Sequence, residues 1–430
     1  MTNNKVELLS PAGNLEKLKI AINYGADAVY AGVSHFSLRI RAGKEFTFET
    51  FKEGIDYAHA RGKKVYATNN GFPFNSQIEL LKKHIKQMAE LKPDGFIVAA
   101  PGVVRLCREI APEIDIHLST QANVLNYLDA QVFWDMGVKR IVVAREISLK
   151  DVKEIKKHLP DMEIEIFVHG SMCFAYSGRC LVSAVQMGRV PNRGSCANDC
   201  RFEYTLYAAN EDHSTLFRLE EEPGVGTYIF NSKDMNLASH LQEILDSGCV
   251  DSLKIEGRTK SPYYAAVTAK AYRTAIDDYY AQSFDAEKYQ RELHTTKNRG
   301  FTDAYLIHRP FEKTDSQNHE YALSKGSYEV SGLVTEDEEH FLCKYKTYPN
   351  EDVEIFAPSG SEFQEVDNEI GKIFKSEDGI YYINFKKILT ETGKELESVH
   401  SGNVNKIKLP GKLPYLTMFR VQNDEAIEVQ

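Results

Sequence analysis

Short apolar runs alternate with amphipathic stretches through the first 170 residues of the chain. The stretches between the runs, such as 15–25 and 78–91, carry apolar residues at three- and four-residue spacings, which is typical of helices that pack on one face. The apolar runs have the length of strands and lie at 6–9, 28–32, 64–68, 96–100, 116–119, 141–144 and 164–168, and an eighth follows at 252–257.

Eight strand–helix units in series predict an α/β fold, a parallel (β/α)8 TIM-like barrel. Gly25 and Gly137 stand just before two of the runs, where the ends of helices are expected. An open doubly wound sheet is the alternative, but no G-x-G-x-x-G motif follows the first run to favour it.

The spacing between the seventh and the eighth run is far longer than the other spacings. It predicts an insertion at about 170–235, directly after the seventh strand. Loops that follow the strands of such a barrel build its C-terminal face, where active sites lie. We therefore expect the insertion to lie over the mouth of the barrel.

The pattern changes after about residue 320. Short alternating strands, separated by clusters of Gly, Pro, Asp and Asn, predict a small antiparallel β-barrel or sandwich. We therefore expect a catalytic barrel domain at 1–310 and a C-terminal β-barrel domain at 320–430. Lysines in the second domain either form a strip that faces phosphates or protect the edges of its sheet.

Four of the seven cysteines lie in the predicted insertion, in the pattern Cys-x6-Cys-x15-Cys-x3-Cys. They are Cys173, Cys180, Cys196 and Cys200. The N-terminus does not resemble a secretion signal, so we expect a cytoplasmic protein, in which a cysteine cluster more often binds metal than forms disulfides. Their spacing favours an iron–sulfur cluster, with zinc as the alternative. If they bind no metal, they are buried thiols with a structural role only.

The chain has a net charge of −10, which argues against a nucleic-acid binder that uses its whole surface. The cysteine window is locally basic, since it carries Arg179, Arg189, Arg193 and Arg201. Arg179 is therefore a candidate binding residue.

Polar residues alternate with aliphatic ones in several of the predicted strands, and the polar sets are expected to point into the barrel. The candidates nearest the C-terminal ends of these strands are His169, Glu256, Arg258, Lys254 and Gln121 as catalytic residues, with Asn69 and Asn70 as binding residues. The alternative is a buried network of ion pairs without chemistry. Hydrolase motifs are absent, although a cysteine nucleophile with His169 as its base is conceivable.

The segment 165–183 resembles the signature of the collagenase-like peptidases, peptidase family U32. The segments 7–14, 251–264 and 298–302 are also similar to this family, so the resemblance covers most of the chain. The fixed positions of the signature are filled by Glu165, Phe167, Gly170, Ser171, Met172, Cys173, Gly178, Cys180, Val182 and Ser183.

The resemblance implies either of two activities. One is tRNA modification: prephenate-dependent hydroxylation of the wobble uridine to 5-hydroxyuridine by an enzyme with a 4Fe-4S cluster and an unknown electron donor. The resemblance implies Cys173, Cys180 and Cys196 as cluster ligands, with Cys200 or Cys249 as the fourth. The other activity is hydrolysis of unfolded or collagen-like polypeptides, and a zinc-stabilised RNA-binding factor without catalysis is a third possibility.

Overall fold

The computed structural model describes residues 5–33, 46–173, 175, 180, 182–187, 196–202, 204, 207–209, 216–218, 232–308, 316, 318, 326–402 and 404–422.

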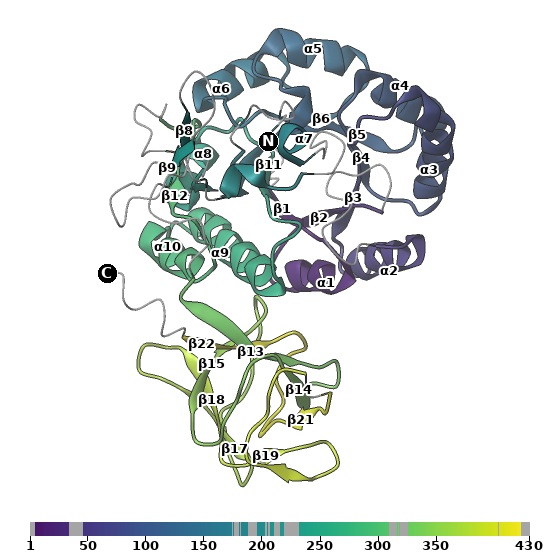
Figure 1. The fold of residues 1–430 in the computed structure, drawn as a ribbon. Helices are drawn as coiled ribbons and strands as arrows, with labels where there is room; N and C mark the ends of the chain where they lie inside the picture. The colour runs from purple at the N-terminus through teal and green to yellow at the C-terminus, as the bar shows by residue number, and fades with distance from the viewer. Residues whose placement is uncertain are drawn as a thin grey trace.

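A closed parallel barrel forms the first part of the molecule (Figure 1). Neighbouring strands pair in chain order from β1 to β7, and β11 closes the ring by pairing in parallel with both β7 and β1. This confirms the predicted barrel and excludes the open sheet. The barrel strands are β1 (Glu7–Pro11), β2 (Ala28–Ala31), β3 (Lys64–Asn69), β4 (Gly95–Val98), β5 (Asp115–Leu118), β6 (Arg140–Val142), β7 (Glu163–Ser171) and β11 (Ser252–Ile255).

Helices surround the barrel and connect its strands. Their apolar faces pack against the outward side chains of the strands in one continuous core. They are α1 (Leu15–Asn23), α2 (Phe48–His59), α3 (Ile78–Glu90), α4 (Pro101–Ile110), α5 (Tyr127–Asp135), α6 (Leu149–His158), α8 (Leu241–Asp246), α9 (Pro262–Tyr280) and α10 (Ala286–His294). Among the described residues, no helix is both long and apolar enough to cross a lipid bilayer.

Local signals in the sequence set the ends of these helices. The Asn14 side chain accepts a hydrogen bond from the backbone of Lys17 at the start of α1. Gly25, with φ of 110°, and Gly137, with φ of 84°, end α1 and α5 in the left-handed conformation that glycine favours. The positions at which the sequence predicted helix ends are thereby confirmed.

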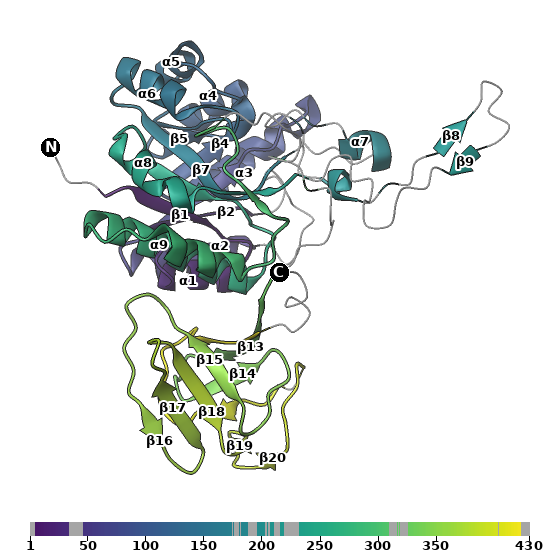
Figure 2. The same cartoon turned by 90° about the vertical axis from the view of Figure 1, so that its left-hand side faces the viewer.

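The long connection between β7 and β11 begins at the C-terminal end of β7. In the described part it carries α7 (Val182–Met187), the 3-10 turn η4 (Asp199–Arg201) and the hairpin of β8 (Tyr207–Ala209) and β9 (Leu216–Arg218). These elements lie to one side of the barrel (Figure 2). Further on, β10 (Asp234–Asn236) pairs antiparallel with the end of β7 and in parallel with β12 (Phe301–Thr302). The predicted insertion after the seventh strand is therefore confirmed.

The C-terminal part is a curled antiparallel sheet below the barrel (Figures 1 and 2). This confirms the predicted antiparallel domain, whose boundaries remain a prediction. In the described residues its strand order is β16-β17-β18-β15-β22-β13-β14-β21. The strands are β13 (Tyr328–Val334), β14 (His340–Cys343), β15 (Asp352–Phe356), β16 (Val366–Asp367), β17 (Gly371–Lys375), β18 (Tyr381–Phe385), β21 (Ile407–Lys408) and β22 (Met418–Gln422), with a separate ribbon of β19 (Ile388–Leu389) and β20 (Glu395–Leu396).

An apolar interface joins the sheet to α1 and α9 of the barrel. The Tyr24 ring stacks on Phe356 with 5.3 Å between ring centroids, and its hydroxyl donates to the backbone carbonyls of Phe356 and Leu416 at 2.7 and 2.9 Å. A buried tyrosine adds a large apolar contact area to such an interface, and the hydrogen bonds of its hydroxyl fix its orientation. The sheet is therefore held in a fixed position relative to the barrel.

Candidate active site at the barrel mouth

A network of buried ion pairs fills the lower part of the barrel, at the N-terminal ends of its strands. Arg140 from β6 lies at its centre, and its guanidinium contacts the carboxylates of Glu7, Glu163 and Glu165. Lys254 from β11 donates to Glu165 at 2.6 Å. This layer matches the alternative in which inward polar residues form a structural network without chemistry.

Electrostatics hold this network in its ionised form. Burial disfavours the charged form of Glu165, but Lys254 and Arg140 outweigh it and lower the pKa of the Glu165 carboxyl. Burial, assisted by Arg140 and Lys254, also holds the pKa of the neighbouring His117 well below its usual range. The His117 imidazole packs neutral against the Tyr66 ring at 4.4 Å between centroids.

Above this layer, at the C-terminal ends of β7 and β11, a second group of polar side chains faces the mouth. The Glu256 carboxylate lies 3.8 Å from the Arg145 guanidinium, and the Tyr30 hydroxyl lies 3.4 Å from the same Glu256 oxygen. Arg145 stacks over the Phe167 ring at 3.8 Å from its centroid. Both side chains are mostly buried, so a pair of opposite charges lies at the C-terminal ends of β6 and β11.

Residues from β3 and β5 complete this layer. The amide of Asn70 lies 3.4 Å from the Ser119 hydroxyl, which donates to the Gln121 side-chain oxygen at 3.0 Å. The Gln121 amide in turn donates to the Asn70 carbonyl at 3.2 Å. Arg258 crosses from the β11 end and donates to Thr68 at 3.0 Å. The structure therefore places Asn70 beside Gln121, Arg258 beside Thr68 and Glu256 beside Arg145, while their roles in a site remain a prediction.

Two predicted site residues point away from the mouth. The side-chain oxygen of Asn69 lies 3.1 Å from His84 of α3, so Asn69 faces the helices outside the barrel. The His169 ring lies against Tyr272 of α9 and Phe301 of β12, at 5.6 and 5.5 Å between centroids. The prediction that both face the barrel interior is wrong for these side chains, and Lys254 belongs to the ion-pair network below.

A β-bulge explains the orientation of His169. The register between β7 and β11 shifts after the pair Lys254–Phe167, so that Ile255 lies opposite His169. One extra residue in a strand moves the following side chains to the other face. His169 is consequently 1% exposed, and burial lowers its pKa to about 3, which leaves the imidazole neutral.

Sequence reasoning missed Arg145 and Tyr30. Arg145 follows the end of β6 by three residues and Tyr30 lies near the end of β2, so both are at the C-terminal ends of strands. Position alone could have identified Arg145, by the same rule that identified Gln121 and Arg258. In the sequence, Tyr30 cannot be told apart from a residue that only fills the barrel interior. In the structure it packs in an interior cluster with Leu9 and Tyr66.

The cysteines of the insertion lie at the same end of the barrel, because Cys173 follows β7 by two residues. All four are free thiols. Burial raises the pKa of Cys180, backbone N–H groups of Val182 and Ser183 oppose this effect, and the nearby thiols of Cys173 and Cys196 add to it. The backbone N–H of Asn198 donates to the Cys196 sulfur at 3.4 Å.

These soft thiols, with N–H donors directed at two of them, have the chemistry of a metal-binding donor set. Within the described part of the chain, however, no three side chains of His, Cys, Asp or Glu lie close enough together to hold a metal ion. Arg179, the remaining predicted binding residue, lies outside the described residues.

Cys249 lies at the opposite end of the barrel. It is buried and precedes β11 in the chain, and its sulfur lies 2.9 Å from the Ser247 hydroxyl. Ser252 of β11 pairs with Glu165 of β7 in the sheet. Cys249 comes before Ser252 in the chain, whereas Cys173 comes eight residues after Glu165, so the two cysteines lie in opposite directions from this pair. At about 3.3 Å per strand residue, Cys249 and Cys173 are separated by roughly 30 Å. Cys200, in η4, is therefore the better fourth member of the group.

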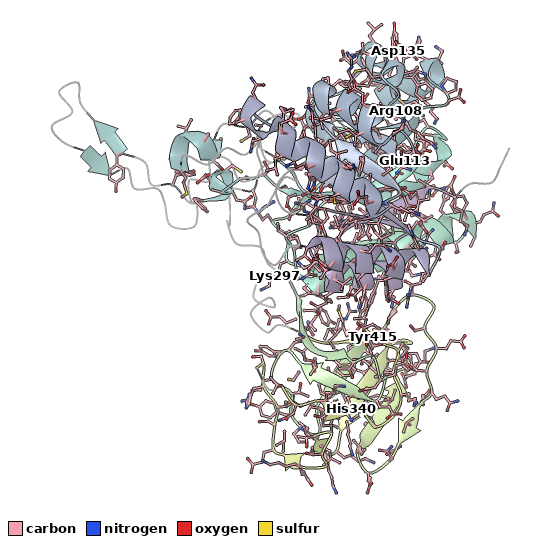
Figure 3. The ribbon with its side chains drawn as sticks, turned by 90° about the vertical axis from the view of Figure 1, so that its right-hand side faces the viewer. Arg108, Glu113, Asp135, Lys297, His340 and Tyr415 are labelled. Carbon is pink, nitrogen blue, oxygen red and sulfur yellow. The ribbon has the colours of Figure 1, made fainter. Side chains whose placement is uncertain are left out.

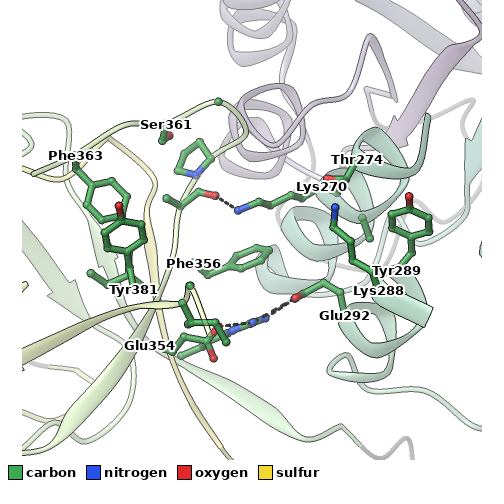
Figure 4. Close-up of a pocket in the computed structure, with 18 residues that line it drawn as sticks. Lys270, Thr274, Lys288, Tyr289, Glu292, Glu354, Phe356, Ser361, Phe363 and Tyr381 are labelled. Carbon is green, nitrogen blue, oxygen red and sulfur yellow. Dashed lines mark hydrogen bonds and ion pairs between the residues drawn. The ribbon is translucent and has the colours of Figure 1, made fainter. Parts of the chain in front are cut away.

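A separate cavity of about 390 Å³ lies between α9, α10 and the C-terminal sheet (Figure 4). Arg420 bridges Glu292 and Glu354 on one side of it, and Lys270 donates to the Ala357 carbonyl at 2.7 Å on the other. Burial lowers the pKa of Lys270 to about 8. The cavity is lined by α9 and α10 rather than by the ends of barrel strands, so it is distinct from the candidate active site.

A closed (β/α)8 barrel with buried polar groups at its mouth, and with cysteines in the segment that follows β7, defines the class of this protein as a TIM-like barrel with an enzyme-like site. The chain belongs to peptidase family U32, whose model matches residues 13–316. This confirms the family resemblance drawn from segment 165–183.

Three relatives illustrate the range of names in this family. The chain is 64% identical to "tRNA hydroxylation protein P" of Helicobacter pylori, over 97% of this chain and 99% of that protein. It is 40% identical to "tRNA hydroxylation protein P" of Escherichia coli, over 83% and 87%. It is also 30% identical to a "Collagenase" of Porphyromonas gingivalis, over 71% and 75%.

Proposed function

We propose that this protein is an RNA hydroxylase that converts a wobble uridine of tRNA into 5-hydroxyuridine at the mouth of its barrel. The observation that carries the proposal is the 64% identity, over nearly the full length of both chains, to a tRNA hydroxylation protein. Substrate tRNA would place the protein in the cytoplasm. The proposal assigns the described polar group at the mouth to base and co-substrate binding.

The proposal includes a 4Fe-4S cluster held by Cys173, Cys180, Cys196 and Cys200. It is supported by the free thiols, by their common place at the C-terminal end of β7 and by the N–H donors directed at Cys180 and Cys196. Such a cluster supplies electron transfer when it is bound. Zinc is the alternative occupant of the same donor set.

The described residues then take separate roles. Arg145 and Arg258 provide two guanidinium groups that suit the carboxylates of a small organic dianion, so prephenate fits this part of the site as a bound co-substrate. The amide groups of Asn70 and Gln121 can donate to and accept from the polar edge of an unstacked base. The Glu256 carboxylate, which lies beside Arg145, can take up the proton that leaves the base carbon.

Nucleoside analysis of tRNA tests the function. Deletion of the gene should abolish 5-hydroxyuridine and the nucleosides derived from it, as measured by mass spectrometry, and the intact gene should restore them. A Glu256→Gln protein that is produced at the normal level should restore little. If the tRNA nucleosides are unchanged in the deletion strain, the proposed function is wrong.

Peptide hydrolysis is the second candidate, because a collagenase is among the relatives. The geometry disfavours a nucleophile activated by His169, since this ring packs against Tyr272 and Phe301 outside the barrel. Cleavage of gelatin by the purified protein, lost in a Cys173→Ala variant, would favour the peptidase. Intact gelatin together with altered tRNA would favour the hydroxylase.

A further inference from the structure

A groove of about 540 Å³ lies at the junction between the barrel and the C-terminal sheet. Its barrel wall includes Lys260 and Ser261, at the start of α9, and Lys297. Its other wall includes Tyr328 and Lys344 of the sheet. Figure 3 shows Lys297 at this junction, on the side of the molecule that carries the insertion. The groove is thus close to the mouth, because Lys260 follows the mouth residue Arg258 by two positions.

The sheet wall presents a basic and aromatic segment. Lys344, Tyr345 and Lys346 follow β14 and are all exposed, and the Tyr345 side chain is 50% exposed. The backbone of this segment is fixed, because the N–H groups of Lys344 and Tyr345 donate to the Ser331 carbonyl at 2.8 and 3.2 Å. A ring held in solvent between two lysines is arranged for stacking on a base while the ammonium groups meet phosphates.

The barrel wall adds positive potential. Helix α9 begins at Pro262 in the groove and is 19 residues long, so the partial positive charge of its N-terminus faces the same space. The Ser261 side chain already accepts from Tyr264 as the helix cap. Two carboxylates, Glu16 and Glu329, also line the groove, and Glu329 is paired with Lys297 at 3.4 Å. Lys344 has no such partner among the described residues.

The topology disfavours an extended peptide as the occupant. Strand β13, which forms the floor of the sheet wall, is paired with β22 on one side and β14 on the other. It therefore offers no free backbone edge to which a peptide strand could add. Exposed lysines around an exposed ring instead match a single strand of nucleic acid, which offers phosphates and stacking faces at each position.

We infer that this groove, together with Lys346 beside it, binds the RNA strand that flanks the target nucleotide, with phosphates at Lys344 and Lys346 and a base on Tyr345. The inference rests on the proposed tRNA substrate and adds the surface that holds it. The positive segment also explains how a chain with a net charge of −10 can approach RNA, since backbone contacts need only a local patch.

Binding of unmodified tRNA, measured by fluorescence anisotropy over a series of salt concentrations, tests the groove. The test variant is the double substitution Lys344→Gln and Lys346→Gln. The matched control is Lys387→Gln with Lys394→Gln, which removes the same charge from the sheet near β19 and β20, at the end farthest from the barrel (Figure 2). Tyr345→Ala tests the stacking ring separately.

The salt slope is the decrease of the logarithm of the binding constant with the logarithm of the salt concentration. Each phosphate contact to a single strand contributes about 0.7 to this slope, so each contact strengthens binding about fivefold at 0.1 M salt relative to 1 M. The groove variant should therefore bind roughly 25-fold more weakly at 0.1 M, with a slope smaller by about 1.4, whereas the control keeps the wild-type slope. Tyr345→Ala should bind roughly tenfold more weakly with the slope unchanged.

If the groove variant and its control lose the same amount of tRNA affinity, the inference is overturned. It is also overturned if both variants keep the tRNA affinity of the wild-type protein. Wild-type protein that binds gelatin but not tRNA would also overturn it and would favour a polypeptide occupant. The tRNA nucleoside assay remains an independent readout. A groove variant with normal tRNA affinity and normal 5-hydroxyuridine would refute the groove and leave the proposed function intact.

Discussion

The buried imidazole of His169 should make the barrel sensitive to mild acid. Its ring is 1% exposed and is enclosed by aromatic rings of α9 and β12, with the Tyr272 hydroxyl 3.4 Å from its Nδ1. Burial lowers the pKa of His169 from 6.5 to about 3. Since the unfolded chain binds the proton more tightly, protonation favours unfolding as the pH falls below 6.5.

The magnitude follows from the two pKa values. Between pH 7.5 and pH 5.5 the unfolded imidazole becomes mostly protonated while the folded one stays neutral, so His169 should cost about 1.4 kcal/mol of stability over this interval. Any folded pKa of about 4 or lower gives nearly the same result. The loss continues at about 1.4 kcal/mol per pH unit until the pH approaches the folded pKa.

Urea unfolding at pH 7.5 and pH 5.5 measures the effect. Trp134 in α5 is the one tryptophan of the chain, so its fluorescence reports unfolding of the barrel. A His169→Gln variant should lose about 1.4 kcal/mol less than wild type between the two pH values. Substitution of the exposed His400 by Gln serves as the control and should keep the wild-type difference. Equal pH dependence in wild type and His169→Gln would refute the argument from burial.

Three further variants test other parts of the structure. Arg140→Met should destabilise the barrel by about 3–5 kcal/mol in urea unfolding, because the buried Glu165 carboxylate and the partly buried carboxylates of Glu7 and Glu163 lose their shared partner. A loss below 1 kcal/mol would contradict this. Gly170→Ala should cost roughly 2 kcal/mol or more, since φ is 108° and a Cβ would lie 2.3 Å from the Glu256 carbonyl oxygen; an unchanged urea midpoint would show that the backbone can relax. Cys196→Ser should lower the iron content of anaerobically purified protein from about four per chain, whereas Cys343→Ser should leave it unchanged; equal iron in both would argue against the proposed ligands.

The sequence was sufficient to predict most of the fold. Strands of a closed parallel barrel are buried on both faces and therefore appear as short apolar runs, which is a local property of the chain. Gly25 and Gly137 marked helix ends because only their backbone adopts the required conformation at low cost. The long spacing before residue 252 placed the insertion correctly after β7, and the alternating pattern after residue 320 indicated an antiparallel sheet.

The candidate site was predicted only in part. The rule that residues after strands face the mouth singled out Asn70, Gln121, Glu256 and Arg258, which follow β3, β5 and β11 and whose roles remain a prediction. It failed for His169, because a bulge changed the register in a way that simple alternation does not encode.

Only the tertiary structure decided which charges meet. Arg140 joins carboxylates from β1 and β7, far apart in sequence, and Arg145 after β6 meets Glu256 after β11, on either side of β7. Such contacts depend on ring closure and on the register between strands, which arise from the packing of the whole chain. The local sequence shows whether a side chain is buried and with which spacing the buried positions recur. The closed barrel decides which other charged side chain it contacts.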